Sequence, residues 1–370
     1  MTQPTITTPP TPGCPDDFEE LLAAIPSLGD DAFAERALGC LLGGALGDAF
    51  GYLVEFDELP RIRARFGPDG LTEFPDGRLI VSDDTQMTLF TLEGLLEAGL
   101  AAPVAAKVQA IRRAYLDWYA TQRGSRPDRD QGLRRYPELW ATRAPGNTCL
   151  GALRAGGRGT VTQPVNDSKG CGGVMRAAPI GLVRADDPET CFRIAVDAAA
   201  LTHGHPSGYL PAGAMAAMVR LMIDGMPLAE AANRTLAMLR GWPGHGETSA
   251  AISGALKRAA APRPDRDIAA LGEGWVGEEA LAVGLYSALV GGDLMRTLVL
   301  AANHDGDSDS TASIAGQLYG AARGLSDIPE RWCGRLDVAA PLAWLSRRLL
   351  AAQAGVITRA PTPATPASHS

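Results

Sequence analysis

The feature that most limits what this chain can fold into is a helical repeat of alanine and leucine that extends from Ala32 to about Ala352. Apolar residues recur there at the spacing of one helix face, whereas the alternating pattern of a half-buried β-strand is nearly absent. The repeat predicts helices over Ala32–Tyr52, Thr85–Leu100, Val104–Gln122, Pro188–Leu201, Ser207–Asp224, Leu228–Arg240, Glu247–Ala261, Glu278–Val290, Leu294–Ala302 and Thr311–Gly324. We therefore expect an all-α domain with functional loops at the helix ends.

Small residues are concentrated in the first predicted helix, at Gly43, Gly44, Ala45, Gly47 and Gly51. Its glycines lower helix propensity, but small residues let a neighbouring helix approach closely. No repeat of about 20 to 50 residues is visible, which disfavours a solenoid.

Both ends of the chain differ in composition from the helical body. The first dozen residues and those from about Pro361 are rich in proline and threonine, and neither stretch can form a core. Apolar residues within Asp16–Asp31 recur at helical spacing behind an acidic start, which predicts a short amphipathic helix that either caps the body or docks another protein. We divide the chain into an N-terminal extension (1–31), one helical domain (32–352) and a disordered tail (353–370).

Charge and cysteine content exclude several functions. Lys and Arg total 34 against 42 Asp and Glu, and the net charge of -8 offers no basic surface for nucleic acid or anionic membranes. The apolar stretch from Cys40 to Val54 contains Asp48 and lies far from the N-terminus, which argues against a signal peptide and a membrane span. The six cysteines form no CxxC pair, so neither a zinc site nor a disulfide framework is indicated. We expect a soluble protein of the reducing cytoplasm.

Two acidic clusters, Ser82-Asp83-Asp84 and Asp307-Ser308-Asp309-Ser310, lie at the predicted starts of helices. Helix capping alone explains either cluster, since Ser and Asp are preferred N-caps and acids favour the positive end of the helix. If the two clusters converge in the fold, their carboxylates repel strongly without cations between them. Carboxylates and hydroxyls without nearby Cys or His favour Mg²⁺, Mn²⁺ or Ca²⁺ over softer metals. The pair of clusters therefore predicts a site for hard divalent cations.

Two acids and two histidines are further candidates for site residues. Asp48 and Glu55 lie seven residues apart and share a face on a continuous helix, although solvated charges explain them equally well. His203 and His205 are two residues apart, a spacing that does not suit a metal pair on a helix. A histidine at a helix end is more often a structural hydrogen-bonding group than a catalytic one.

Glycines mark two further segments. Asn166–Leu182 is a glycine-rich loop predicted to open a helix, where free N–H groups and the helix dipole favour a diphosphate. Turn formation is the more common reason for such glycines, and the pattern of a P-loop is absent. Gly146-Asn147-Thr148 is explained by an ordinary helix N-cap.

Taken together, these segments resemble the ADP-ribosylglycohydrolase (DraG-like) family of all-α dinuclear hydrolases, from about Ala37 to Gly324. The resemblance implies a single-domain orthogonal multi-helix bundle with a dinuclear metal site at helix ends. It implies that one Mg²⁺ or Mn²⁺ ion is held by Ser82, Asp83, Asp84 and Asp309, and the other by Asp307, Asp309 and Ser310. Family members more often have Thr at the positions of Ser82 and Ser310, and serine keeps the hydroxyl ligand.

The resemblance also assigns roles outside the acidic clusters. Glu55 and Asp307 are the implied catalytic residues, and Glu55 matches a glutamate that orients or deprotonates the attacking water. The glycine-rich loop is similar to the family's GNGxxMR loop, with Cys171 in place of the usual Asn. The implied substrate contacts are Asp48, Gly170, Cys171, Gly172, Met175, Arg176 and His203.

The resemblance implies that the protein is a metal-dependent hydrolase, which removes ADP-ribose from a modified protein side chain. The expected mechanism is attack by water at the anomeric carbon, and arginine is the side chain expected first. Serine-linked, DNA-linked and free ADP-ribosyl substrates stay open. The alternative is an immunity protein that neutralises an ADP-ribosyltransferase toxin, through occlusion by the N-terminal extension as well as or instead of hydrolysis. A metal-dependent phosphohydrolase ranks below both, because its sequence signatures are absent.

Overall fold

The computed structural model describes residues 32–124 and 132–354. Over these ranges the chain is helical and contains no β-strand, only two isolated bridges that join Leu79 to Leu336 and Gly170 to Val276. The all-α prediction is confirmed. None of the helices in these ranges is long and apolar enough to cross a membrane. The helix predicted within Asp16–Asp31, and with it any docking role of the N-terminal extension, lies outside the described residues.

Fourteen helices of eight or more residues make up most of the described chain. They are α2 (Ala32–Gly51), α3 (Leu59–Phe66), α4 (Asp83–Ala98), α5 (Val104–Gln122), α6 (Asn147–Arg154), α8 (Pro188–Ala200), α9 (Pro206–Ile223), α10 (Leu228–Leu239), α11 (Gly246–Ala259), α12 (Pro264–Leu271), α13 (Gly277–Val290), α14 (Leu294–Ala302), α15 (Ser308–Arg323) and α17 (Ala339–Gln353). The short helical turns are η2 (Gly132–Arg135), η3 (Pro137–Trp140), η4 (Cys171–Gly173), α7 (Ala178–Gly181), η5 (Leu325–Asp327) and α16 (Glu330–Cys333). Every helix predicted from the repeat is present with its ends shifted by at most three residues.

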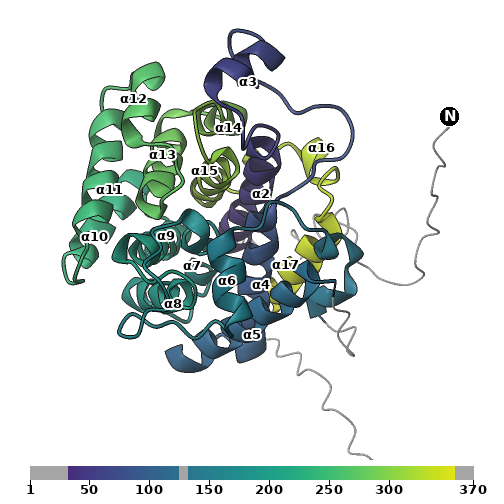
Figure 1. Ribbon diagram of the computed structural model, residues 1–370, viewed down its shortest axis with the longest axis vertical. Coiled ribbons are helices and arrows are strands. Elements are labelled where there is room, and N and C mark those ends of the chain that lie inside the picture. The colour runs from purple at the N-terminus through teal and green to yellow at the C-terminus, as the bar shows by residue number, and fades with distance from the viewer. Residues whose placement is uncertain (1–31, 125–131, 355–370) are drawn as a thin grey trace, which may run out of the picture.

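Helices α2 and α15 form the buried centre of the molecule (Figure 1). Their backbones touch through glycines: a Cβ on Gly43 would lie 2.3 Å from the carbonyl oxygen of Gly316, and one on Gly51 would lie 2.1 Å from that of Ser308. No methyl group fits at either position, so the close approach expected from the small residues is confirmed. Because Gly43 faces Gly316 and Gly51 faces Ser308, the helices are antiparallel. The end of α2 therefore lies beside the start of α15.

The other helices pack around this central pair. Helices α13 and α14 contact α15, α8 packs against α9, and α4 packs against α5 and α17. Figure 1 shows α10 to α13 on one side of α2 and α15, α16 and α17 on the other, and α4 and α5 below α2. The starts of α4, α6 and α15 thereby reach the same region as the turn that follows α2.

Candidate active site

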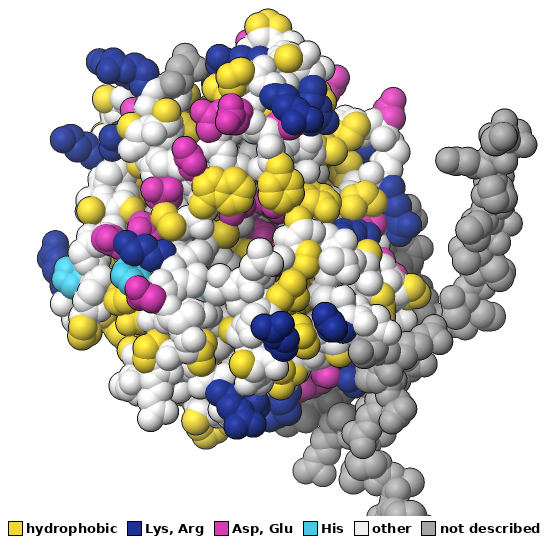
Figure 2. Space-filling view, in the orientation of Figure 1, with side chains coloured by type: hydrophobic (Ala, Val, Ile, Leu, Met, Phe, Trp, Pro, Cys, Tyr) yellow, Lys and Arg dark blue, Asp and Glu magenta, His cyan; other side chains and the backbone are white. Residues whose placement is uncertain are grey.

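A cleft of about 460 Å³ opens where these helix starts meet. It is lined by Glu55, Phe56, Asp83, Asp84, Ala144–Cys149, Gly170–Gly172, Met175, His203, Trp275, Asp307, Asp309 and Ser310. Figure 2 shows acidic side chains beneath a row of hydrophobic side chains near the middle of this face. Segments that are far apart in the sequence thus share one cavity.

The two acidic clusters converge in this cleft. Asp83 and Asp84 begin α4, whereas Asp307 is the N-cap of α15 and Asp309 lies in its first turn. All four side chains are buried, with residual exposures of 2–5%. Burial, followed by the charges of Asp84 and Asp307, raises the pKa of Asp309 well above its usual value. The carboxylates therefore repel one another in a site with little water to screen them.

Several of these carboxylate oxygens lack a partner. Glu55 Oε2, Asp83 Oδ2 and Asp84 Oδ2 are buried and accept no hydrogen bond within the described part of the chain. Hard cations neutralise buried carboxylates of this kind, and these three residues line one cleft, so the residues present fit such ions. No three His, Cys, Asp or Glu side chains among residues 32–124 and 132–354 form a complete ligand group as they stand. The dinuclear arrangement therefore stays a prediction.

The hydroxyls of the clusters differ in their surroundings. Ser310 lines the cleft, and its hydroxyl lies 3.5 Å from the Cys171 sulfur. Ser82 is fully buried at the N-cap of α4, where its hydroxyl accepts a hydrogen bond of 3.2 Å from the Asp84 N–H. The capping explanation therefore holds for Ser82, and ligation by Ser82 stays a prediction.

Glu55 and Asp48 do not share a helix face, because α2 ends at Gly51 and Glu55 lies in the following turn. Glu55 is buried at the edge of the cleft, and burial, followed by the charges of Asp307 and Asp83, raises its pKa to about 9. The helix ends within one residue of the predicted Tyr52, so the shared face of a continuous helix does not arise, and the catalytic role of Glu55 stays a prediction.

Asp48 is fully buried and does not line the cleft. Its carboxylate accepts hydrogen bonds of 2.8 Å from the Ser82 N–H and 2.9 Å from the Thr85 N–H, and a further one from the Thr85 hydroxyl. Asp48 is therefore not placed to contact a substrate in the cleft, contrary to the prediction. Its carboxylate instead accepts hydrogen bonds from backbone N–H groups at the start of α4, and so positions Asp83 and Asp84.

Arg176 is likewise buried behind the cleft instead of in it. Its guanidinium lies 4.2 Å from the centre of the Tyr115 ring and donates a hydrogen bond of 2.7 Å to the Thr202 hydroxyl. The predicted contact between Arg176 and substrate is therefore also corrected. The hydrogen bond from Arg176 to Thr202 holds the Thr202–His203 turn from the interior of the protein.

His203 lines the cleft, where its ring packs beneath the glycine-rich loop. Its Nδ1 lies 2.8 Å from the Thr202 hydroxyl, which also accepts from Arg176. Burial, followed by the charge of Arg176, lowers the pKa of His203 to about 3, so the ring is neutral near pH 7. When the Thr202 hydroxyl donates to Nδ1, the proton resides on Nε2 and is available to a ligand. His205, in contrast, is the N-cap of α9 and does not line the cleft.

The glycine-rich loop does not open a full helix as predicted. It leads into the single turn η4 and then into α7, which has only four residues. Cys171 begins η4, and its thiol lies 2.8 Å from Asp307 Oδ2, to which it donates. Burial, followed by the charge of Asp307, raises the pKa of Cys171, so the thiol stays protonated. Gly172 admits no side chain, since a Cβ there would lie 2.9 Å from the Cys149 sulfur.

The sequence reasoning missed two groups of cleft residues. Phe56 and Trp275 line the mouth of the cleft, and their only sequence signal is the adjacency of Phe56 to Glu55. Ala144 also lines the cleft and has a φ of 49°, which no local pattern indicated. The helix start predicted at Gly146 is present, but no side chain caps α6, so its first N–H groups lack that partner.

The fold and the cleft together define an all-α protein whose carboxylates converge at the starts of two helices, in contact with a glycine-rich loop. The model of the family described as ADP-ribosylglycohydrolase matches residues 29–359. The chain therefore belongs to the ADP-ribosylglycohydrolase family, as the sequence resemblance indicated, and it is an enzyme.

Individual relatives agree with this assignment. The chain is 28% identical over 318 residues to ADP-ribosyl-[dinitrogen reductase] glycohydrolase of Rhodospirillum rubrum, which covers 82% of this chain and 91% of the relative. It is 27% identical over 301 residues to ADP-ribosylarginine hydrolase Tri1 of Pseudomonas putida strain GB-1, covering 80% and 73% of the two chains. A solved structure described as an ADP-ribosylglycohydrolase-related protein complex matches with a TM-score of 0.58 at 26% identity, covering 86% of this chain and 98% of the other.

Proposed function

We propose that this enzyme is a metal-dependent hydrolase that removes ADP-ribose from modified arginine side chains of proteins. The observation that carries the proposal is the convergence of Glu55 with the two acidic clusters on one cleft, with three buried carboxylate oxygens unpaired. The names of the relatives support the substrate, since one acts on a modified protein and Tri1 on ADP-ribosylarginine.

The acidic clusters are the groups that would hold the cations. Asp83 and Asp84 from α4 and Asp307 and Asp309 from α15 supply carboxylates, and Ser82 and Ser310 supply hydroxyls. Bound Mg²⁺ or Mn²⁺ would neutralise these acids and lower the pKa of a water molecule at the site.

Residues of the chain itself account for the remaining steps. Glu55 has a free oxygen at the cleft edge. Bound cations would offset the neighbouring negative charges that contribute to its raised pKa, and the carboxylate form is suited to orient the attacking water and to accept its proton. The carboxylates around it favour the positive charge that develops at the anomeric carbon as the glycosidic bond breaks.

The start of α6, which also lines the cleft, suits the diphosphate of ADP-ribose. The first N–H groups of α6 have no side-chain cap there, and the positive end of the helix favours an anion. His203 lines the same cleft, whereas the N–H groups of Gly170 and Cys171 already donate to the Ser168 hydroxyl and the Trp275 carbonyl. No Lys or Arg lines the cleft within the described ranges, so the diphosphate depends on the start of α6, on His203 and on bound cations.

The test is release of ADP-ribose from an arginine-modified peptide by the purified protein with Mg²⁺ or Mn²⁺. We expect Glu55→Gln to lower kcat by about 100-fold or more, the usual loss when a general base is removed. Asp307→Ala and added chelator should each abolish most of the turnover. Asp69→Ala, which removes an exposed acid away from the cleft, is the matched control and should leave kcat unchanged. Absence of ADP-ribose release by the wild type, or full activity of Asp307→Ala, would refute the proposal.

A further inference from the structure

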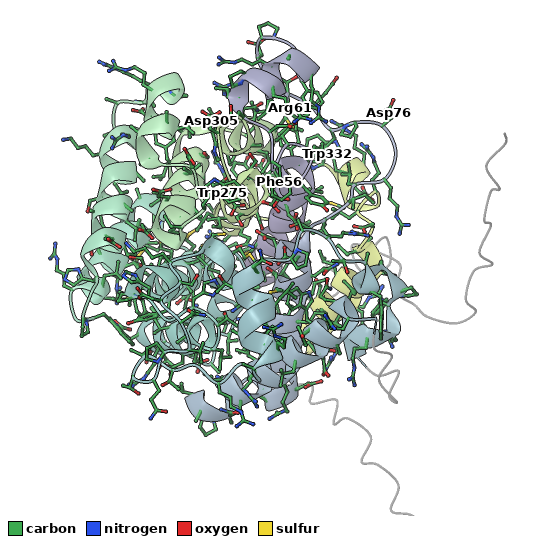
Figure 3. All side chains as sticks on the ribbon, in the orientation of Figure 1. Phe56, Arg61, Asp76, Trp275, Asp305 and Trp332 are labelled. Atoms are coloured by element: carbon green, nitrogen blue, oxygen red, sulfur yellow. The ribbon has the colours of Figure 1, made fainter. Side chains whose placement is uncertain are left out.

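Two exposed aromatic rings meet at the mouth of the cleft. Phe56 is 71% exposed and Trp275 is 43% exposed, and they are two of only five large hydrophobic residues that are exposed in the described ranges. Their ring centroids are 6.4 Å apart and their planes differ by 19°. Figure 3 shows the two side by side. Exposed apolar groups that gather at a cavity generally indicate a contact with a ligand or partner.

The two rings come from separate segments that the site itself holds in place. Phe56 directly follows Glu55 in the turn after α2. The carbonyl of Trp275 accepts a hydrogen bond of 3.2 Å from the Cys171 N–H. A Cβ on the adjacent Gly274 would lie 3.5 Å from the Asp307 Cβ. The rings therefore lie over the acidic floor of the cleft, next to the residues proposed for catalysis.

We propose that Phe56 and Trp275, the aromatic lip, bind the guanidinium group through which the target arginine is linked to ADP-ribose. This inference rests on the proposed function. A guanidinium is planar, cationic and weakly hydrated, and it stacks well on an aromatic face. The cleft beneath is lined by five carboxylates and, in the described ranges, by no Lys or Arg, so the lip region favours a cation.

The lip would select the linkage as well as hold it. A serine-linked ADP-ribosyl group has a neutral oxygen at the position where an arginine-linked one has the guanidinium. The stacking energy is therefore available only to the arginine-linked substrate. Because the guanidinium stacks in the bound substrate before the bond breaks, the lip should act on KM more than on kcat.

The experiment compares Phe56→Ala, Trp275→Ala and their double variant on arginine-linked and serine-linked ADP-ribosyl peptides. We expect each single variant to raise KM for the arginine peptide about two- to five-fold, with a larger rise in the double variant and little change in kcat. Affinity for free ADP-ribose, measured by calorimetry, should stay unchanged. Phe56→Leu, which keeps apolar bulk without a ring, should resemble Phe56→Ala. Phe66→Ala removes another exposed aromatic outside the cleft and should have no effect.

A binding measurement separates failure of the lip from failure of the proposed function. With Glu55→Gln as background, the Kd of the intact arginine peptide is measured with and without the lip substitutions, so no turnover is required. If the lip substitutions leave both Kd and KM unchanged, the proposed role of the aromatic lip is refuted. A parallel loss of affinity for free ADP-ribose would also overturn it, because the rings would then hold the ADP-ribose itself. Failure of the wild type to release ADP-ribose would refute the proposed function while leaving this binding comparison intact.

Discussion

At the scale of single residues, the Thr202 hydroxyl joins the buried interior to the cleft. It accepts a hydrogen bond from the buried Arg176 and lies 2.8 Å from Nδ1 of His203, which faces the cleft. Arg176 Nε has no partner in the described part of the chain, so this hydroxyl is one of the few groups that compensate the buried charge. The position thus has a structural role and contacts the ring of a cleft residue.

Thr202→Val should therefore lower the free energy of unfolding by about 2 kcal/mol, the usual cost of removing a hydrogen bond to a charged group. Valine has nearly the same shape, so the loss is attributable to the hydroxyl. Urea denaturation at pH 7 measures it. Thr202→Ser keeps the hydroxyl and should lose less than half as much. Equal losses in the two variants would show that packing of the methyl group matters, and not the hydrogen bond.

At the scale of helices, the contact between α2 and α15 decides where the catalytic groups lie. Glycines on both helices let the backbones meet, with Gly43 against Gly316 and Gly39 against Gly320. The antiparallel contact brings the turn that contains Glu55 to the start of α15, where Asp307 and Asp309 lie. A small separation of the two helices would therefore change the distances within the site.

Gly43→Ala should destabilise the protein by about 3 kcal/mol or more, because its methyl group would lie 2.3 Å from the Gly316 carbonyl oxygen and force the helices apart. A lower melting temperature in differential scanning calorimetry is the readout. Gly151→Ala in α6 is the matched control, since nothing lies within 4 Å of its Cβ. That control should be neutral or stabilising by up to about 1 kcal/mol, because alanine favours the helix. A neutral Gly43→Ala would mean that the helices do not touch as described.

At the scale of the whole molecule, folding concentrates negative charge in one cavity. Burial, followed by the charge of Asp48, raises the pKa of both Asp83 and Asp84. The fold therefore carries an electrostatic penalty that is concentrated at the ends of its central helices. A ligand that removes this penalty binds the folded chain far better than the unfolded one, and so stabilises it.

Mg²⁺ or Mn²⁺ should consequently raise the melting temperature of protein freed of metal by chelation. At an ion concentration about 100 times Kd, linkage predicts a gain of about 2.7 kcal/mol for one site. Thermal melts with and without each ion measure the gain, independently of turnover. Asp307→Ala should lose most of it, whereas Asp69→Ala should keep it. An equal gain in Asp307→Ala would place the ions outside the proposed site.

The sequence by itself determined the ten helices that the repeat predicts and the order of the candidate site residues, but the repeat gave no range for α3, α6, α12 or α17. The repeat predicted α5 and α14 to the residue, because the burial of one helix face is encoded locally at a 3.6-residue spacing. The acids of Asp83-Asp84 and Asp307–Asp309 were recognisable for the same reason, since they lie at helix starts that the local pattern indicates.

Only the tertiary structure decided what those residues contact. Asp48 and Arg176 were predicted as site residues, yet helix packing buries both behind the cleft. Asp48 accepts hydrogen bonds from N–H groups at the start of α4, and Arg176 donates one to Thr202 in the turn before α9. Phe56 and Trp275 gave no joint signal, because they meet only after distant segments pack together. A local pattern specifies which face of a helix is buried, but the partner of that face depends on the whole chain.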